Sequence, residues 1–205
     1  MKLILTSSGL GTSKLRREFS NMLEKRVALV KVMVIHTAKK SEHLVYVNEV
    51  GKELGYIGVL HPNITYFNIA RERSSPKISD YDAVYVCGGN TFYILDRIRK
   101  TGLERAIKKF VGNGGLYVGV SAGSIIAGQD IEIAGWGSEG DLNEINLKDL
   151  RGLHLTDIAI FPHYKLRLRK EVEGFKQRVT YPIEVAKDGE AIIIKGRNIK
   201  KIKRD

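Results

Sequence analysis

The 205-residue sequence predicts an α/β fold, a three-layer α/β/α sandwich around a mainly parallel sheet. Short apolar runs rich in β-branched residues, which are typical of buried parallel strands, recur along the whole chain. Segments with apolar residues at helical spacing separate these runs. Strand and helix therefore alternate, and right-handed crossovers between parallel strands are expected.

The expected strands are the apolar runs, and the expected helices lie between them. The strands are residues 3–5, 27–35, 83–86, 116–120, 158–161 and 191–194. The helices are residues 15–23, 42–54, 92–98, 103–111 and 166–179. Glycine-rich turns mark places where a strand leads into a helix or loop, at residues 88–90, 112–115 and 135–140. Residues 191–202 are expected to form a C-terminal hairpin with its turn at Gly196-Arg197-Asn198.

The length of the chain fits one domain spanning residues 1–205, without repeats or linkers. A hydrophobic fraction of 43% and a charged fraction of 28% are typical of a folded chain. No apolar stretch approaches the roughly 20 residues that cross a bilayer. The single cysteine, Cys87, fits a reducing compartment. We therefore expect a cytoplasmic protein with no membrane contact.

The formal net charge of +11 raises the question of a nucleic acid partner. Basic residues are spread over separate segments, at 14–17, 97–100, 165–170 and 195–204, and aromatic residues do not interleave with them. This distribution favours a solvated basic surface over a nucleic acid site. We therefore expect no nucleic acid partner.

The sharpest chemical signal is Gly119-Val120-Ser121-Ala122-Gly123, at the end of the expected strand 116–120. This Gly-x-Ser-x-Gly pattern is typical of a nucleophile elbow, where a serine stands on a tight strand-to-helix turn and small neighbours let the chain pass close by. A close-packed junction without catalysis would also explain the glycines. The place of the pattern after a strand favours Ser121 as a nucleophile.

A second glycine turn, Gly88-Gly89-Asn90, follows the expected strand 83–86. Adjacent glycines leave backbone N–H groups open to a ligand, so Gly89 and Ala122 are the expected donors of an oxyanion hole. Asn90 is a candidate substrate-binding residue. A helix cap at Asn90 or Thr91 would explain the same turn.

The chain contains five histidines, and each is a candidate general base for Ser121. His163 follows the expected strand 158–161 and is expected at the same sheet edge as Ser121. His36 also ends an expected strand and is the second candidate. The others have polar or structural surroundings in the sequence, and they are His43, His61 and His154.

A catalytic histidine needs an acceptor for its second ring nitrogen. Asp188 precedes the expected strand 191–194, which would place it beside the strand of His163 if the two strands pair. Glu190 and Glu184 remain alternatives, and an ordinary turn would also explain Asp188.

Two arginines, Arg167 and Arg169, follow His163 closely and are candidates for binding a substrate carboxylate. A basic helix that also contains Lys165 and Lys170 would explain them equally. The chain shows no His-Glu-x-x-His motif, cysteine pair or carboxylate cluster with ligand spacing, so neither a metal nor a cofactor is expected.

Three motifs, Gly-Gly-Asn-Thr-Phe at 88–92, Gly-x-Ser-Ala-Gly at 119–123 and Pro-His-Tyr at 162–164, occur in the order and rough spacing of a known family. They resemble the serine peptidase family of aspartyl dipeptidase (peptidase E) and cyanophycinase, and the resemblance covers nearly the whole chain. The fold of that family is similar to that of class I glutamine amidotransferases. The resemblance implies that Ser121 is the nucleophile and His163 the base, with an acidic residue near Asp188.

The resemblance also implies a substrate class, namely short peptides and in particular dipeptides with an N-terminal aspartate. The spacing His163-Tyr164-x-x-Arg167-x-Arg169 is similar to that of the cyanophycinase branch, which implies aspartyl-arginine peptides as an alternative. A non-catalytic protein that binds an anionic ligand at its glycine turns is a further alternative. A small peptide is the expected partner, and the protein is expected to be a monomer or a homodimer.

Overall fold

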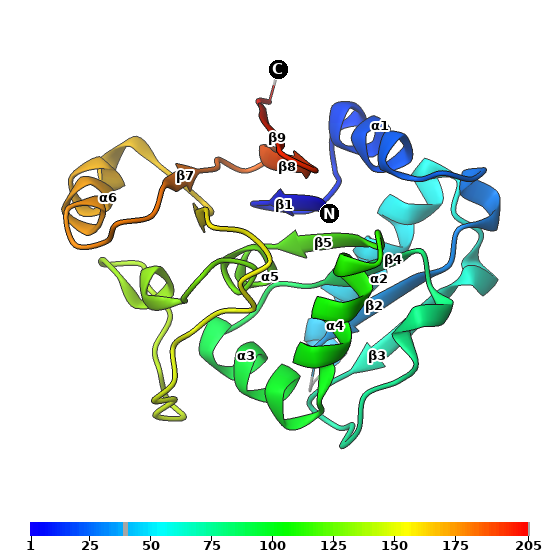
Figure 1. The fold of residues 1–205 in the computed structure, drawn as a ribbon, viewed down its shortest axis with the longest axis horizontal. Helices are drawn as coiled ribbons and strands as arrows, with labels where there is room; N and C mark the ends of the chain where they lie inside the picture. The colour runs from blue at the N-terminus through cyan, green and yellow to red at the C-terminus, as the bar shows by residue number, and fades with distance from the viewer. Residues whose placement is uncertain (39–40, 205) are drawn as a thin grey trace.

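The computed structural model describes residues 1–38 and 41–204, with the backbone alone for residues 41–44. Its centre is a seven-stranded sheet in the order β3-β2-β4-β5-β1-β8-β9 (Figure 1). Five strands are parallel, namely β1 (Lys2–Thr6), β2 (Val32–His36), β3 (Ile64–Asn68), β4 (Ala83–Val86) and β5 (Leu116–Val120). The last two form an antiparallel hairpin beside β1, and they are β8 (Ala191–Lys195) and β9 (Asn198–Ile202). The expected mainly parallel sheet and C-terminal hairpin are confirmed.

Helices cover both faces of this sheet. One face carries α1 (Ser13–Met22) and α2 (Ser41–Ile57). The other face carries α3 (Thr91–Lys100), α4 (Leu103–Gly112) and the short α5 (Ala122–Ile125). The expected helices therefore form, and the three-layer arrangement is confirmed.

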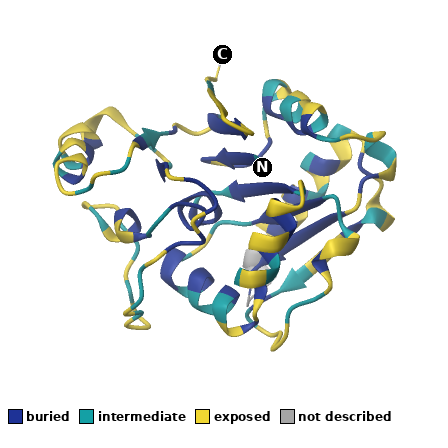
Figure 2. Cartoon of the chain, in the orientation of Figure 1, coloured by how far each residue is buried: buried dark blue, intermediate teal, exposed yellow. Residues whose placement is uncertain are grey.

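Alternation along the strands assigns the apolar side chains to the two layers. In β1, Ile4 packs in the core with α1 and α2, whereas Leu3 and Leu5 pack in the core with α3 and α4. All three side chains have no exposed surface. Figure 2 shows the same division along the sheet, with buried central strands and helices exposed on their outer faces. The sheet thus separates two hydrophobic cores.

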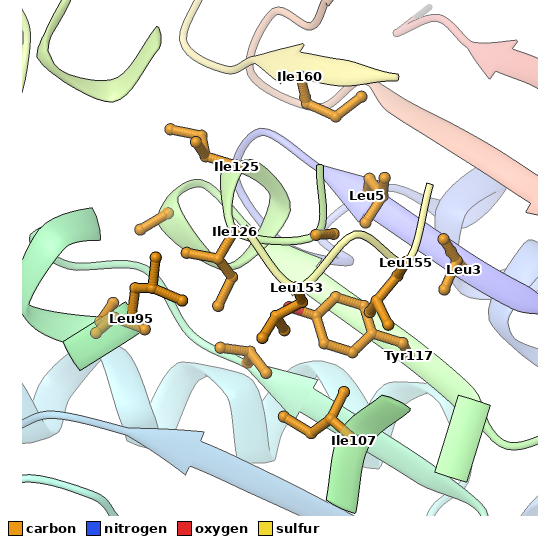
Figure 3. Packing of buried hydrophobic residues seen from close by; sticks show 14 of the residues in the cluster. Leu3, Leu5, Leu95, Ile107, Tyr117, Ile125, Ile126, Leu153, Leu155 and Ile160 are labelled. Carbon is orange, nitrogen blue, oxygen red and sulfur yellow. The ribbon is translucent and has the colours of Figure 1, made fainter. Parts of the chain in front are cut away.

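A second, two-stranded parallel sheet stands beside the main one. It consists of β6 (Ala159–Phe161) and β7 (Ile183–Val185), joined by the 3-10 turn Leu166–Leu168 and α6 (Arg169–Lys176). Ile160 of β6 lies in the same core as Leu5 and Ile125, as Figure 3 shows. The expected strand 158–161 therefore exists but does not join the main sheet, which corrects the expectation that all strands share one sheet.

Other elements differ from the expected ones in their type or their bounds. Residues 27–35 contain a 3-10 turn, Val27–Leu29, before β2 begins, and not one long strand. The expected helix 166–179 begins as a 3-10 turn and ends at Lys176. Three more 3-10 turns occur in the connections, at His61–Asn63, Ile78–Asp80 and Glu132–Gly135. The hairpin turn is Gly196-Arg197, because Asn198 already pairs with Lys195.

The carboxyl ends of three central strands meet at one edge of the sheet. Thr6 of β1 lies opposite Val120 of β5, and Val86 of β4 lies opposite Gly119 of β5. The residues that follow these strands are consequently neighbours, as expected for an α/β sheet whose ligands bind at this edge. Over the described residues, no helix combines the length and the apolar character that a membrane crossing requires.

Candidate active site

Ser121 stands on a strained turn between β5 and α5. Its backbone has φ 50° and ψ −113°, a conformation that L-residues rarely adopt and that is typical of a nucleophile elbow. The flanking glycines are required by close approach. A Cβ on Gly119 would lie 2.4 Å from the carbonyl oxygen of Gly123, and a Cβ on Gly123 would lie 2.3 Å from that of Val86. The Gly-x-Ser-x-Gly pattern thus forms the elbow expected from the sequence.

His163 and Asp188 complete a hydrogen-bonded chain with Ser121. The Nε2 atom of His163 lies 2.9 Å from Oγ of Ser121, and its Nδ1 atom lies 2.7 Å from Oδ1 of Asp188. A serine, an imidazole and a carboxylate in this order form the arrangement of a catalytic triad. The structure therefore brings together the three residues that the sequence indicated.

The route by which His163 and Asp188 meet differs from the expected one. The strand of His163 pairs with β7, while the strand after Asp188 pairs with β1, so the two strands are not neighbours. Backbone hydrogen bonds from Ala186 N–H to Phe161 and from Tyr164 N–H to Ala186 extend the β6 and β7 pairing toward the site. The turn that contains Asp188 then crosses from the small sheet to the main sheet beside His163.

Ser7 is a site residue that the sequence analysis missed. It directly follows β1, and its side chain has no exposed surface. Its hydroxyl donates to Oδ1 of Asp188 over 2.8 Å and accepts the backbone N–H of His163 over 2.8 Å. The next residue, Ser8, accepts the backbone N–H of Gly189 over 2.9 Å. A polar pair directly after a central strand was the signal that could have revealed this role.

Asp188 has a net lowered pKa that results from opposing effects. Partial burial raises the pKa of its carboxyl, but hydrogen bonds from Ser7 and His163 and the charge of Lys165 together outweigh that effect. The side chains of His163 and Asp188 are 46% and 57% exposed. Ser7 is therefore a fully buried donor to a carboxylate whose side chain is more than half exposed.

The alternative acids are engaged elsewhere or lie apart. The Oε2 atom of Glu190 accepts the backbone N–H of Lys187 over 3.0 Å and pairs with Lys201 at 3.1 Å. Glu184 lies within β7, and no described contact joins it to His163. Of the three candidate acids, Asp188 alone bonds the imidazole.

The other histidines do not contact Ser121 among the described residues. His36 lies at the end of β2, where burial and then the charge of Arg71 lower its pKa and its Nδ1 atom accepts the N–H of Ala38. His154 bonds Asp157 at 2.8 Å. His61 belongs to the 3-10 turn before β3. The side chain of His43 lies outside the described residues.

The two expected oxyanion donors lie beside Ser121. Gly89 has φ 140°, which suits glycine, and Ala122 is the first residue of α5. A Cβ on Gly88 would lie 3.2 Å from Cβ of Ser121, so the glycine turn packs directly against the elbow. No described residue accepts a backbone hydrogen bond from Gly89 or Ala122. Neither N–H group therefore has a backbone acceptor in the described part of the chain.

Asn90 is the N-cap of α3, and it also lines a cavity that contains Ser121 and His163. Its Oδ1 atom accepts the N–H of Tyr93 over 3.0 Å, and its amide donates to the carbonyl of Leu142 over 2.8 Å. Thr91 donates from its N–H and its hydroxyl to Asp141. The start of α3 thus holds the 135–146 loop in place through the side-chain amide of Asn90 and through Thr91.

Two cavities open on either side of the Ser121 and His163 pair. The larger, about 900 Å³, is lined by residues of α2 and of the turns after β1 and β4. The smaller, about 290 Å³, is lined by Asp188, Lys165 and part of the 135–146 loop. Ser121, His163 and Gly89 line both. Because Glu144 and Ile145 of the same loop line the larger cavity, this loop shapes both sides of the site.

Neither candidate arginine lines these cavities. Arg167 forms an ion pair with Glu139, and that carboxylate also pairs with Lys165 at 3.2 Å. Arg169 is exposed at the start of α6. The cation that does line the site is Lys165, which the sequence analysis treated only as part of a basic helix. Among residues 1–38 and 41–204, no group of His, Cys, Asp or Glu side chains is arranged to hold a metal ion.

Comparison with known proteins agrees with this geometry. The model of peptidase family S51 matches residues 3–202. An uncharacterized peptidase of Listeria monocytogenes is 30% identical over 204 residues, covering 96% of each chain. A peptidase E of Nostoc sp. is 30% identical over 169 residues, covering 79% of this chain and 64% of the relative.

Solved structures share the fold. A crystal structure of a protein from Listeria monocytogenes, provisionally assigned as a peptidase E, has a TM-score of 0.80 at 28% identity and covers 100% of this chain and 98% of its own. A peptidase from an acI-B1 actinobacterium has a TM-score of 0.70 at 16% identity, covering 98% and 86%, and shares the fold alone. The chain therefore belongs to peptidase family S51, the serine peptidases that resemble peptidase E.

Proposed function

We propose that this protein hydrolyses short peptides with Ser121 as the nucleophile. Ser121 attacks the carbonyl carbon of the peptide bond while His163 takes the hydroxyl proton. His163 then returns that proton to the leaving amine, and water releases the acyl group from Ser121 in a second, equivalent step. The single observation that carries this proposal is the 2.9 Å separation between Oγ of Ser121 and Nε2 of His163.

Asp188 and Ser7 position the base in this proposal. Asp188 accepts Nδ1–H of His163, which keeps Nε2 free to take the proton and stabilises the imidazolium that forms. Ser7 holds the carboxylate and the backbone of His163 with one hydroxyl. Ser7 touches no reacting atom, so we assign it a positioning role.

The N–H groups of Gly89 and Ala122 stabilise the oxyanion of the tetrahedral intermediate in this scheme. Their support is their place beside Ser121 and the absence of an acceptor for either group among the described residues. Each oxyanion donor contributes about 3 kcal/mol to the lowering of the barrier in serine enzymes. The chemistry proposed here draws on side chains and backbone alone.

A dipeptide with an N-terminal aspartate is the substrate we propose first. The peptidase E relatives support this choice, because similar chains carry that name. In the smaller cavity, Lys165 is the one described lysine or arginine that could bind a substrate carboxylate, and it already pairs with Glu139. The other acidic residues that line this cavity are Asp141, Glu171 and Asp188. Arg167 contributes indirectly, through the Glu139 that it shares with Lys165.

The test compares Asp-Leu and Asn-Leu as substrates of the wild-type protein and of Ser121→Ala. We expect the wild-type protein to hydrolyse Asp-Leu. In Ser121→Ala we expect kcat/KM to fall by about a thousandfold or more. Equal rates in both proteins would remove Ser121 from the mechanism. If the wild-type protein hydrolysed the two peptides at equal rates, the proposal of a peptidase would stand, and the proposed preference for an N-terminal acidic residue would be rejected.

A further inference from the structure

The larger cavity beside Ser121 contains a carboxylate that the proposed reaction does not use. Glu53 of α2 lines this cavity together with Ser121 and His163. It is part-buried, and the cavity wall near it is formed by Tyr85, Cys87 and the 7–9 turn after β1. Glu53 is thus a part-buried carboxylate in a cavity of about 900 Å³ that also contains the proposed nucleophile. This position raises the question of which ligand group the carboxylate binds.

The two oxygens of Glu53 have different surroundings. Oε2 accepts the N–H of Leu10 over 2.9 Å and the hydroxyl of Tyr85 over 3.2 Å. Oε1 accepts no hydrogen bond from any part of the chain that the structure describes. A structural role of Glu53, in which it holds the loop after β1, explains the contacts of Oε2 but not the position of Oε1. Within the described residues, Oε1 is therefore an acceptor without a donor.

The backbone is shaped around this carboxylate. Gly9 has φ 94°, and a Cβ there would lie 2.9 Å from each carboxylate oxygen of Glu53. The same short segment holds Asp188 and His163 through Ser7 and holds Glu53 through Leu10. Glu53 is therefore fixed relative to the triad by a few residues of continuous chain.

Among the described residues that line the larger cavity, the formally charged side chains are all of one sign. Of its described lining residues, those with a formal charge at neutral pH are Glu49, Glu53 and Glu144. Burial raises the pKa of Glu53, and hydrogen bonds from Leu10 and Tyr85 and the charge of Arg16 offset only part of that rise. A cation bound in the cavity would favour the ionised carboxyl and complete its hydrogen bonds.

We propose that Glu53 binds a protonated amine or guanidinium group of the peptide held at Ser121. This inference rests on the proposed peptidase function and adds a cation-binding side to it. Glu53 repels a substrate carboxylate and so directs it away from the larger cavity. The cation is either the α-ammonium group of the substrate or a basic side chain.

The experiment measures binding without turnover, in Ser121→Ala protein with and without Glu53→Gln. Glutamine keeps an oxygen for Leu10 and Tyr85, so the loop is retained while the charge is lost. The peptides are Asp-Arg and Asp-citrulline, which differ in side-chain charge, and Asp-Leu and its N-acetylated form, which differ in the α-ammonium group. Calorimetry gives a dissociation constant for each. Glu72→Gln, an exposed position outside both cavities, is the matched control.

We expect one charged peptide to bind about tenfold or more tightly than its neutral counterpart, and Glu53→Gln to reduce that ratio to within about twofold. The peptide pair whose affinity ratio falls in Glu53→Gln shows whether the bound cation is the basic side chain or the α-ammonium group. Glu72→Gln should leave the ratio unchanged. A ratio that persists in Glu53→Gln, or the absence of any charge preference before Glu53 is changed, overturns the proposal. Failure of the peptidase function itself would appear separately, as a lack of hydrolysis by protein with Ser121 intact.

Discussion

Replacing Ser7 by alanine tests whether one buried hydroxyl positions the catalytic base. The variant loses the 2.8 Å hydrogen bond to Asp188 and the 2.8 Å acceptor for the N–H of His163. A hydrogen bond to a charged group contributes roughly 1.5–3 kcal/mol. The Asp188 side chain is 57% exposed, so in the variant water replaces part of the lost hydrogen bond, and the net loss is about 1 kcal/mol. The N–H left without its acceptor costs about 1 kcal/mol more.

These two losses, about 2 kcal/mol together, correspond to a decrease in kcat of roughly 30-fold if they are expressed in the transition state. KM should stay within about twofold, because Ser7 bonds groups of the triad and not the proposed substrate. The pKa of the Asp188 carboxyl should rise, because one of the hydrogen bonds that lower it is gone.

The assay combines steady-state kinetics on Asp-Leu with a carbon NMR titration of Asp188. Ser8→Ala is the matched control, because Ser8 bonds the same turn through Gly189 but touches neither Asp188 nor His163 in any described contact. We expect Ser8→Ala to retain most of kcat. A Ser7→Ala variant with unchanged kcat and an unchanged pKa at Asp188 would refute the positioning role.

Three further changes separate catalysis from folding. Asp188→Asn should lower kcat by ~10²–10⁴-fold in peptide hydrolysis, with little change in melting temperature, because the amide cannot hold the imidazole in the productive tautomer; a loss below about tenfold would exclude Asp188 as the third member. Glu190→Gln should keep activity but lower the melting temperature at neutral pH by a few degrees, since hydrogen bonds from Lys187 and Lys201 outweigh burial and lower the Glu190 pKa. A lowered pKa gives stability that is complete above the unfolded value and lost as the pH falls through the folded one, so the two proteins should converge in acid, and a pH-independent difference would contradict this. Gly123→Ala should destabilise the fold by about 2 kcal/mol or more in denaturant unfolding because its Cβ meets Val86, whereas Gly174→Ala in α6, where nothing lies within 4 Å, should be neutral or stabilising; equal effects would be inconsistent with the close approach.

The elements that the sequence predicted best are those buried on both faces. Ala83–Val86 and Leu116–Val120 coincide with the expected strands, because a central parallel strand needs apolar residues along its whole length. β3 at the sheet edge escaped prediction because its exposed Thr65 and Tyr66 interrupt the apolar pattern. Local pattern thus identified the central strands and missed the edge strand β3.

The triad residues were predictable, but the way they meet was not. Ser121 and His163 each follow an apolar run and carry a local signal. The pairing of β6 with β7 in a separate sheet depends on contacts between residues distant in sequence, which periodicity does not report. The same limit applies to Arg167, whose partner Glu139 comes from the 135–146 loop.

The most direct test of the triad is modification of the protein by a fluorophosphonate, followed by intact mass and peptide mapping. We expect one adduct per chain on Ser121, no adduct in Ser121→Ala, and a much slower reaction in His163→Ala. An adduct on another residue, or equal modification of wild type and Ser121→Ala, would contradict this expectation.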